Sequence, residues 1–230
     1  KLGFHVGVYA PKEEQSKYIY DKVRNRAESD HCKEIMSDPE IDTKLVKSRG
    51  DVVAWSNGSF LKAETASPTA KVEGGTFHLL IMDEAQDITE YKMTKELRPM
   101  LTATNGSVVM IGTVSTLKGG FYKAIKLNFK IQEAKESTQL HFEYPYEKVI
   151  SEKRKVFDKT QNDFHLNYEL AVDKEIARLG GNLDAEEFKM NYRLIWQDAI
   201  ASAIDAVSFI ACANKDLDMN LPRKIGRMVA

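Results

Sequence analysis

The sequence predicts an α/β protein with a mostly parallel sheet and a small helical subdomain. A strand-like segment, His5–Ala10, leads into an amphipathic helix over Pro11–Ala27. Two short apolar runs, Leu79–Met82 and Val108–Ile111, are typical of strands that a parallel sheet buries on both faces. After Pro145 the apolar residues recur at helical spacing, which indicates a change of architecture.

The composition is that of an ordinary globular protein. With 230 residues and 43% hydrophobic content, the chain can bury the core of one large domain or of a domain with a small satellite. Lysine and arginine number 33 against 34 acids, so a net charge of −1 indicates no global attraction to nucleic acid. The longest nearly apolar stretch, Ala199–Ala213, is too short to span a bilayer and contains Asp205. Cys32 and Cys212 have no Cys/His cluster nearby, which favours reduced thiols in a cytoplasm over a disulfide or zinc site.

The segment after the first helix predicts a β-hairpin and a loop. Asn57-Gly58 separates two β-rich runs, Asp51–Trp55 and Ser59–Glu64, and this dipeptide is a strong hairpin signal. The following Ala66–Gly75 contains Ser-Pro and Gly-Gly pairs, which predict a loop leading into the first apolar run.

Caps, glycine-containing turns and alternation predict three further elements before Pro145. These are a helix that Thr89 caps and that extends to about Met100, a helix that opens at Gly119-Gly120 and ends near Asn128, and a short strand over Gln139–Tyr144. Asn105-Gly106 predicts the turn before the Val108–Ile111 strand.

Three helices are predicted in the smaller unit. Gly180-Gly181 separates the second from a third helix that Asp184 caps, with Glu187 three residues later as in a capping box. The apolar stripes of the first two consist of Tyr146, Val149, Ile150, Val156 and Phe157, and of Phe164, Tyr168, Val172, Ile176 and Leu179. We therefore expect a larger α/β core over 1–144, a helical subdomain and linker over 145–214, and a linker with the beginning of a strand over 215–230.

Two adjacent carboxylates, Asp83 and Glu84, follow the Leu79–Met82 strand directly. In an open α/β sheet, ligands bind beyond the carboxyl ends of the strands. There one acid can hold a Mg²⁺ ion while the next contacts the water that attacks a γ-phosphate. This is the Walker B arrangement, and it predicts a P-loop NTPase of the RecA/ASCE type that uses ATP and Mg²⁺. The alternative is a buried strand that merely ends in an acidic turn.

A small polar loop follows the next strand, with the sequence Gly112-Thr113-Val114-Ser115-Thr116. Loops of this kind follow Walker B in translocating ATPases, although a plain strand-ending turn also explains so short a signal. Gln86 and Asp87 are explained by the start of the next helix, because an acid near a helix N-terminus is favourable by itself.

The 230 residues contain no G-x-x-x-x-G-K-[ST] motif, which would cradle the phosphates and supply a lysine. We therefore expect this segment alone to be inactive, and the P-loop to lie on its N-terminal side. Both ends are expected to be artificial, because Lys1 is not Met and Gly226–Ala230 ends on what is typical of a strand just beginning.

The order and spacing of these segments resemble the large terminase subunits of tailed bacteriophages, the motors that push DNA into an empty capsid. Val6–Val23 is similar to the strand and helix that follow their P-loop helix, His78–Ile88 to their Walker B block, and Val108–Thr116 to their coupling motif. Leu183–Trp196 resembles the helix that closes their lid, and Gly226–Ala230 the strand that introduces their nuclease domain. The resemblance implies an incomplete P-loop NTPase core with a small helical lid.

The resemblance also implies roles and partners. Asp83 would hold the Mg²⁺ ion and Glu84 would polarise the hydrolytic water. Gly112, Thr113 and Ser115 would sense the γ-phosphate and relay its loss. The implied partners are double-stranded DNA, the terminase small subunit, the phage portal protein and further copies of the chain in a homo-oligomeric ring, with no membrane, in the host cell cytoplasm. A nuclease is implied for the parent protein and not for this segment.

Basic residues give further candidates. Arg49 and Arg98 could supply a positively charged finger to the transferring phosphate, although a surface ion pair explains either one. Basic runs of this kind are usually solvated helix faces, and none here is interleaved with aromatic residues. The candidate DNA contacts are Lys44, Lys47 and Arg49, then Lys153, Arg154 and Lys155, then Arg223, Lys224 and Arg227.

Two other functions remain open. A superfamily 1 or 2 helicase has a motif similar to DEAQD, but its next strand usually ends in GD with a glutamine that contacts nucleotide, and here that strand ends in Gly112-Thr113. A non-hydrolysing assembly module with a degenerate ATPase fold is the other, and the intact Asp83-Glu84 pair argues against it. The sequence upstream of Lys1 discriminates, because it either contains GKT or GKS or does not.

Overall fold

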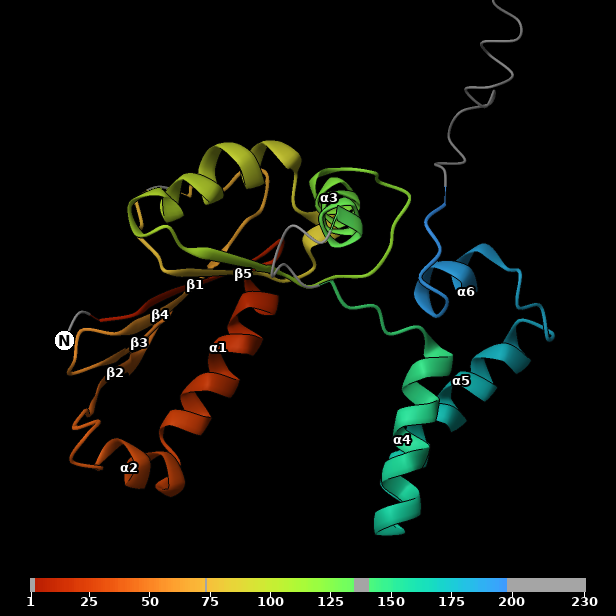
Figure 1. The fold of residues 1–230 in the computed structure, drawn as a ribbon, viewed down its shortest axis with the longest axis horizontal. Coiled ribbons are helices and arrows are strands. Elements are labelled where there is room, and N and C mark those ends of the chain that lie inside the picture. The colour runs from red at the N-terminus through yellow and green to blue at the C-terminus, as the bar shows by residue number, and fades with distance from the viewer. Residues whose placement is uncertain (1–2, 73, 135–140, 198–230) are drawn as a thin grey trace, which may run out of the picture. The chain divides into compact units, whose positions relative to one another are not determined.

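The computed structural model describes residues 3–72, 74–134 and 141–197 of the chain. In these residues six strands form one sheet in the order β2-β3-β4-β1-β5-β6 (Figure 1). The strands are β1 (His5–Ala10), β2 (Leu45–Arg49), β3 (Val52–Trp55), β4 (Phe60–Thr65), β5 (Leu79–Met82) and β6 (Ser107–Met110). β1 pairs in parallel with β4 and β5, and β5 with β6, whereas β2, β3 and β4 form an antiparallel meander. The predicted α/β class, the hairpin and the mostly parallel sheet are confirmed.

The register brings the carboxyl ends of four parallel strands, β4, β1, β5 and β6, to one edge of the sheet. Tyr9 of β1 pairs with Met82 of β5, and Met82 pairs with Met110 of β6. Parallel strands run in the same direction, so the residues that follow Met82 and Met110 leave the sheet side by side. The loops after β5 and β6 are therefore neighbours in space.

Helices cover both faces of the sheet (Figure 1). α1 (Glu13–Ala27) covers one face, and η2 (Lys92–Leu97), η3 (Arg98–Thr104) and α3 (Gly120–Ala134) cover the other. The other two helices of this part are α2 (Asp30–Met36), which follows α1, and η1 (Ala85–Asp87), which follows β5. Side chains alternate between the faces along each strand, so Val8 of β1 packs with Tyr20 of α1, and Tyr9 faces the opposite way toward η3. The sheet thus supports two apolar layers.

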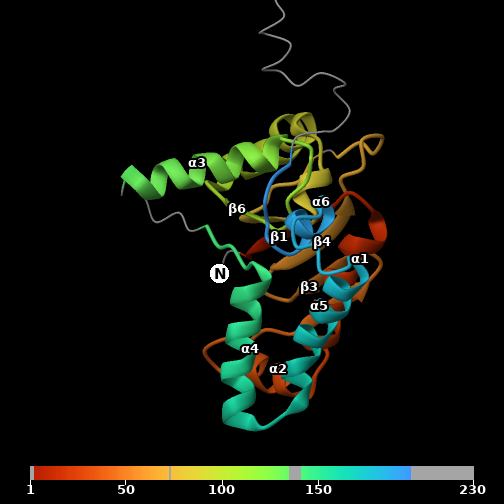
Figure 2. The same ribbon diagram turned by 90° about the vertical axis from the view of Figure 1, so that its right-hand side faces the viewer.

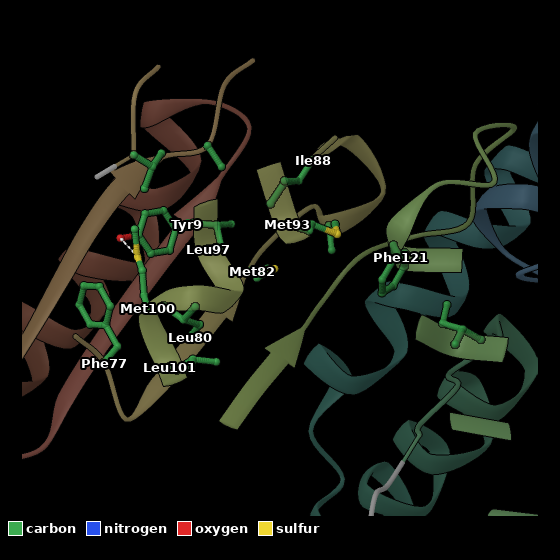
Figure 3. Close-up of a cluster of buried hydrophobic side chains, with 14 residues drawn as sticks. Tyr9, Phe77, Leu80, Met82, Ile88, Met93, Leu97, Met100, Leu101 and Phe121 are labelled. Atoms are coloured by element: carbon green, nitrogen blue, oxygen red, sulfur yellow. Dashed lines mark hydrogen bonds between the residues drawn. The ribbon is translucent and has the colours of Figure 1, made fainter. Parts of the chain in front are cut away.

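The larger apolar cluster lies between the sheet and the helices that follow β5 (Figure 3). Tyr9, Leu80 and Met82 contribute from the strands, and Met93 and Leu97 from η2, and each of these residues is at most 1% exposed. Removing a large side chain from such a core costs about 2–5 kcal/mol, because the cavity collapses only partly. This packing holds the end of β5 in place.

The sequence predicts one α-helix from Thr89 to about Met100 after β5, and the predicted type of helix is wrong. Residues 92–97 form a π-helix, η2, and residues 98–104 form a 3₁₀-helix, η3. Pro99 lies at the start of η3 and has no N–H to donate to the preceding turn, which interrupts regular α-helical bonding. The predicted cap is present, since the Lys92 N–H donates to the Thr89 hydroxyl at 3.3 Å.

Two elements were not predicted. α2 contains no buried residue, so it has no apolar periodicity to detect, and its clearest sequence signal is Ser29, which accepts a hydrogen bond from the Cys32 N–H. β2 pairs with β3 through an irregular register between Leu45 and Lys47. Lys47 and Arg49 are typical of a solvated segment, so the sequence pattern did not indicate a strand here.

Two predictions beyond β6 also differ from the structure: one concerns a strand, and the other concerns the end of a helix. In the described part of the Gln139–Tyr144 segment, residues 141–144, there is no strand. The alternating pattern imitates a strand, but the described residues of this segment pair with neither edge strand of the sheet, β2 or β6. Instead Phe142 and Tyr144 stack on each other with most of their surface exposed. α3 continues past Asn128 to Ala134, because neither glycine nor proline follows to stop it.

The helical unit contains α4 (Tyr146–Thr160), η4 (Asp163–Leu166), α5 (Asn167–Arg178) and α6 (Glu186–Asn191) (Figure 2). Gly180 and Gly181 have φ angles of 62° and 81°, so the predicted break lies in the left-handed region that glycine favours. Asp184 does not cap α6: its N–H donates to the Asn182 side chain, and the cap position belongs to Ala185. The domain bounds stay predictions, and the predicted linker and strand over 215–230 lie outside the described residues. In the described part of the chain, no helix is long and apolar enough to cross a membrane.

Candidate functional site

β5 delivers Asp83 and Glu84 to the carboxyl edge of the sheet, as the sequence predicts. The Asp83 N–H donates to the Tyr9 carbonyl at 2.8 Å, which extends the pairing of β1 and β5 by one residue. The Ile111 N–H likewise donates to the Met82 carbonyl at 2.8 Å. The two carboxylates therefore start from a backbone that hydrogen bonds hold on both sides.

Asp83 has a carboxylate whose charge the protein disfavours. Burial is the main cause and raises its pKa above the usual range, and the charge of Glu84 raises the pKa further. The Glu84 backbone N–H, which hydrogen-bonds to the Asp83 carboxylate, opposes this effect and lowers the pKa. A cation beside Asp83 would stabilise its ionised carboxylate.

Glu84 has a left-handed backbone, with φ of 48° and ψ of 45°. Residues other than glycine, asparagine and aspartate rarely adopt this conformation, and it occurs most often in turns and functional sites. It turns the chain from β5 into η1, where the buried Ala85 donates its N–H to the Ile111 carbonyl at 2.9 Å. The turn thus joins the loop after β5 to the loop after β6.

Gln86 connects these two loops through its side chain. Its amide nitrogen, Nε2, donates to Glu84 Oε2 at 2.7 Å, and its amide oxygen, Oε1, accepts from the Thr113 N–H at 3.1 Å. Sequence reasoning placed Gln86 only at the start of a helix, and it does belong to η1. Its contacts were missed because they depend on the neighbouring positions of β5 and β6.

The loop after β6 shows where the other predicted residues lie. Gly112 and Thr113 follow Ile111 at the same edge as Glu84, and both are exposed. The Ser115 hydroxyl accepts from the Leu117 N–H at 3.2 Å, a local turn contact. The structure thus brings Asp83, Glu84, Gly112 and Thr113 to one edge, while Ser115 bonds within its own loop.

The arginine and lysine candidates are dispersed. Arg98 lines an open groove of about 720 Å³ together with Gly112 and Thr113. On α4, Arg154 pairs with Glu169 and Lys155 with Glu152. Lys44 and Lys47 are exposed near or on β2, and Lys153 is half-buried on α4. Arg49 lies on β2, and Arg223, Lys224 and Arg227 lie outside the described residues.

The donor set fits Mg²⁺ better than a metal held by protein alone. In the residues that the structure describes, no three His, Cys, Asp or Glu side chains gather as a metal cage. Mg²⁺ usually keeps several waters and binds one or two carboxylates together with substrate phosphates. Asp83, half-buried beside a second acid, meets that description.

Comparison with solved structures identifies the fold. A mutant of the large terminase ATPase domain from Thermus phage P74-26 matches with a TM-score of 0.56 at 15% identity, over 85% of this chain and 78% of that chain. The chain has the fold of a phage large terminase ATPase domain. This is a P-loop NTPase fold, as the sequence predicts, and at 15% identity the likeness concerns the fold alone.

Two other terminase structures match less fully. The same ATPase domain in another structure matches with a TM-score of 0.40 at 18% identity, over 49% of each chain, so the chain spans about half of its length in that match. The large terminase of bacteriophage HK97 matches with a TM-score of 0.43 at 13% identity, over 64% of this chain and 29% of that chain. No protein-family model and no curated protein matches the chain.

Proposed function

We propose that this chain is part of the ATPase motor of a phage terminase, which drives DNA into a capsid by hydrolysing ATP. One observation supports this most strongly: in a terminase-type fold, the Walker B carboxylates Asp83 and Glu84 lie at the carboxyl edge of the sheet, beside the loop that follows β6. That edge is where open α/β sheets bind nucleotides.

Each carboxylate has its own role. Asp83 would hold Mg²⁺, since its burial and the neighbouring Glu84 make it a carboxylate that a cation stabilises. The bound ion supplies charge that offsets the negative oxygens of the triphosphate. Glu84 orients the attacking water and accepts its proton, because it follows the metal-holding acid and its carboxylate is held by Gln86.

Gly112 and Thr113 transmit the state of the nucleotide. They lie beside Glu84 and lead through the rest of their loop into α3. A loop that contacts the γ-phosphate at one end and a helix at the other can convert phosphate loss into movement. We assign these two residues to coupling rather than to the chemical step.

The remaining parts of the motor come from outside these 230 residues. The sequence contains no G-x-x-x-x-G-K-[ST] motif, so this segment alone does not hydrolyse ATP. In the parent protein, the partners are double-stranded DNA, the terminase small subunit, the portal protein and further copies of the chain in a ring. The parent protein also has a nuclease activity and works in the host cell cytoplasm.

The test uses the full-length protein. Asp83→Ala should lower Mg²⁺-dependent ATP turnover by about 10² or more, the scale at which a charged group positioned on a transferring phosphate acts. Asp87→Asn is the matched control, because Asp87 is an exposed acid in the same turn, and its turnover should stay near wild type.

A second assay separates motor from helicase. The wild-type protein should package duplex DNA into empty capsids and should not separate the strands of a duplex. Strand separation without packaging would replace the terminase proposal with the helicase, and ATP turnover that is unaffected by Asp83→Ala would overturn both.

A further inference from the structure

The amide of Gln86 lies between the two loops of the proposed site and contacts both. Nε2 donates to Glu84 Oε2 at 2.7 Å, and Oε1 accepts from the Thr113 N–H at 3.1 Å. An ionised carboxylate only accepts hydrogen bonds and a backbone N–H only donates them, so a single orientation of the amide satisfies both partners. Neither a carboxylate nor an apolar side chain at position 86 could make both contacts.

Gly112 leaves the space that this amide occupies. A Cβ atom at position 112 would lie 2.3 Å from Gln86 Oε1, far inside van der Waals contact, and 3.2 Å from the Ala85 nitrogen. The amide is the flexible end of a side chain and would be displaced by a larger residue, while the Ala85 backbone and the Phe121 ring, each 3.2 Å from such a Cβ atom, would have to shift slightly. Glycine at this position and glutamine at 86 therefore fit each other.

The backbone on both sides of the amide is held in place. Ala85 is fully buried and donates its N–H to the Ile111 carbonyl at 2.9 Å. Beyond these anchored residues, the Glu84 side chain and the Thr113 backbone are bridged by the Gln86 side chain. Thr113 is exposed, so its position can change while Ala85 stays fixed.

We infer that Gln86 is a positioning residue that holds the Glu84 carboxylate toward its water and ties that position to the loop of Gly112 and Thr113. The inference rests on the proposed function, because the position of Glu84 matters only if Glu84 acts on a water. When Thr113 moves, the amide loses one of its two partners and holds Glu84 less firmly. Hydrolysis thereby depends on the state of the coupling loop.

The first measurement is steady-state ATP turnover of the full-length protein. Gln86→Leu should lower kcat by about tenfold or more and leave KM for ATP within about twofold, since misplacing a catalytic group affects the transition state more than binding. Asp87→Asn, in the same turn but without the bridging amide, should leave both parameters unchanged. An unchanged kcat in a folded Gln86→Leu variant would overturn the inference.

A double-mutant cycle shows whether Gln86 acts through Glu84. In the Glu84→Gln background, Gln86→Leu should have little further effect on kcat, because the carboxylate that it positions is gone. Equal fold losses in both backgrounds would overturn the inference. Normal turnover of Glu84→Gln alone would instead overturn the proposed function, so the two failures are distinguishable.

Two more variants test the two contacts of Gln86, to Glu84 and to Thr113, one at a time. Gln86→Glu keeps an acceptor for the Thr113 N–H but places a carboxylate against Glu84, so kcat should fall at least as far as in Gln86→Leu. Gly112→Ala displaces the amide, so it should lower kcat and should not add to the loss in Gln86→Leu. If Gln86→Leu fails to fold, Gln86→Glu decides the question, because it keeps the size of the side chain.

Amide hydrogen exchange tests the contact without any chemistry. In Gln86→Leu the Thr113 amide should exchange several-fold faster than in wild type, whereas in Gln86→Glu it should keep most of its protection. The Ala85 amide should keep its protection in both variants, since it bonds to Ile111. Unchanged exchange at Thr113 in Gln86→Leu would contradict the bridge.

Discussion

Asp83 combines its proposed Mg²⁺-binding role with a cost to the folded protein. Burial, the largest cause, raises the pKa of its carboxyl, and Glu84 adds to the effect. The folded state therefore binds this proton more tightly than the unfolded state does. The stability that Asp83 contributes is present at low pH and is lost as the pH rises through the carboxylate range.

Asp83→Asn should accordingly stabilise the protein at neutral pH. In the absence of Mg²⁺, the melting temperature of the variant should exceed that of the wild type at pH 7, and the difference should shrink toward pH 3, where the wild-type carboxyl is protonated. Thermal melting of the two proteins across this range measures it. A difference that stays constant with pH would show that ionisation of Asp83 is not its cause.

A substitution at Thr113 distinguishes a role in coupling from a role in ATP hydrolysis. Thr113→Val keeps the shape of the side chain and the backbone N–H that donates to Gln86, and removes only the hydroxyl. ATP binding should stay nearly intact, and DNA translocation should fall further than hydrolysis does, by roughly tenfold against twofold. Packaging velocity and ATP turnover on one preparation measure the two losses. Equal losses would make Thr113 an ordinary active-site contact, and no loss would favour a plain strand-ending turn.

The sequence predicts the positions of the site residues better than their contacts. Asp83 and Glu84 follow an apolar run, and a strand of that kind ends at the edge where ligands bind. The Gln86 bridge could not be predicted, because it requires β5 and β6 to be neighbours and Glu84 to adopt a left-handed backbone. Neither property follows from local periodicity.

η2 contains a buried ion pair that joins it to the loop before β5. Lys92 is 2% exposed, and its Nζ donates to the Glu96 carboxylate at 2.9 Å and to the Ala70 carbonyl. Glu96 also accepts from the Val72 N–H at 3.3 Å, and its bond to Lys92 lowers its pKa. Together these contacts attach residues 70–72 to η2, the helix after β5.

The two partners of this pair should differ in their mutational cost. Glu96→Leu leaves the Lys92 ammonium buried without its counter-ion and should lower the free energy of unfolding by about 3 kcal/mol. Lys92→Met should cost less, because the Glu96 side chain is 24% exposed and water can solvate its carboxylate. Denaturant unfolding measures both.

A matched pair on α1 serves as the control. Glu13 and Lys17 have the same i,i+4 spacing but are more than half exposed, so Glu13→Gln should cause no measurable loss. A cost for Lys92→Met that equals or exceeds that for Glu96→Leu would contradict this explanation of the pair.

Elements with an apolar pattern or a clear turn were predictable, and elements without them were not. β1, β5, β6 and the β3-β4 hairpin match their predictions within a residue or two. α2 and β2 bury too little for a pattern to form, and η2 replaces a regular α-helix because Pro99 and tertiary packing outweigh local propensity. The described residues of the false strand near His141 have the right alternation but pair with no strand of the sheet.

The sheet as a whole explains why so short a motif can form a site. Four parallel strands, β4, β1, β5 and β6, end at the same edge, and the loops after β5 and β6 meet there through backbone hydrogen bonds from Ala85 and Ile111. The strand order could not be predicted from the sequence, because β1 pairs with β4 and β5 across long intervals. The parallel class could be, since buried apolar runs are typical of it.

The most direct test of the account is ATP hydrolysis by the full-length protein with Glu84→Gln. The substitution keeps the size of the side chain and removes the carboxylate that accepts a proton from water. Mg-ATP should bind with near-normal affinity, and single-turnover hydrolysis should fall by about 10² or more, the scale of a positioned general base. Binding with near-normal hydrolysis would contradict the assignment of this edge of the sheet as the ATPase site.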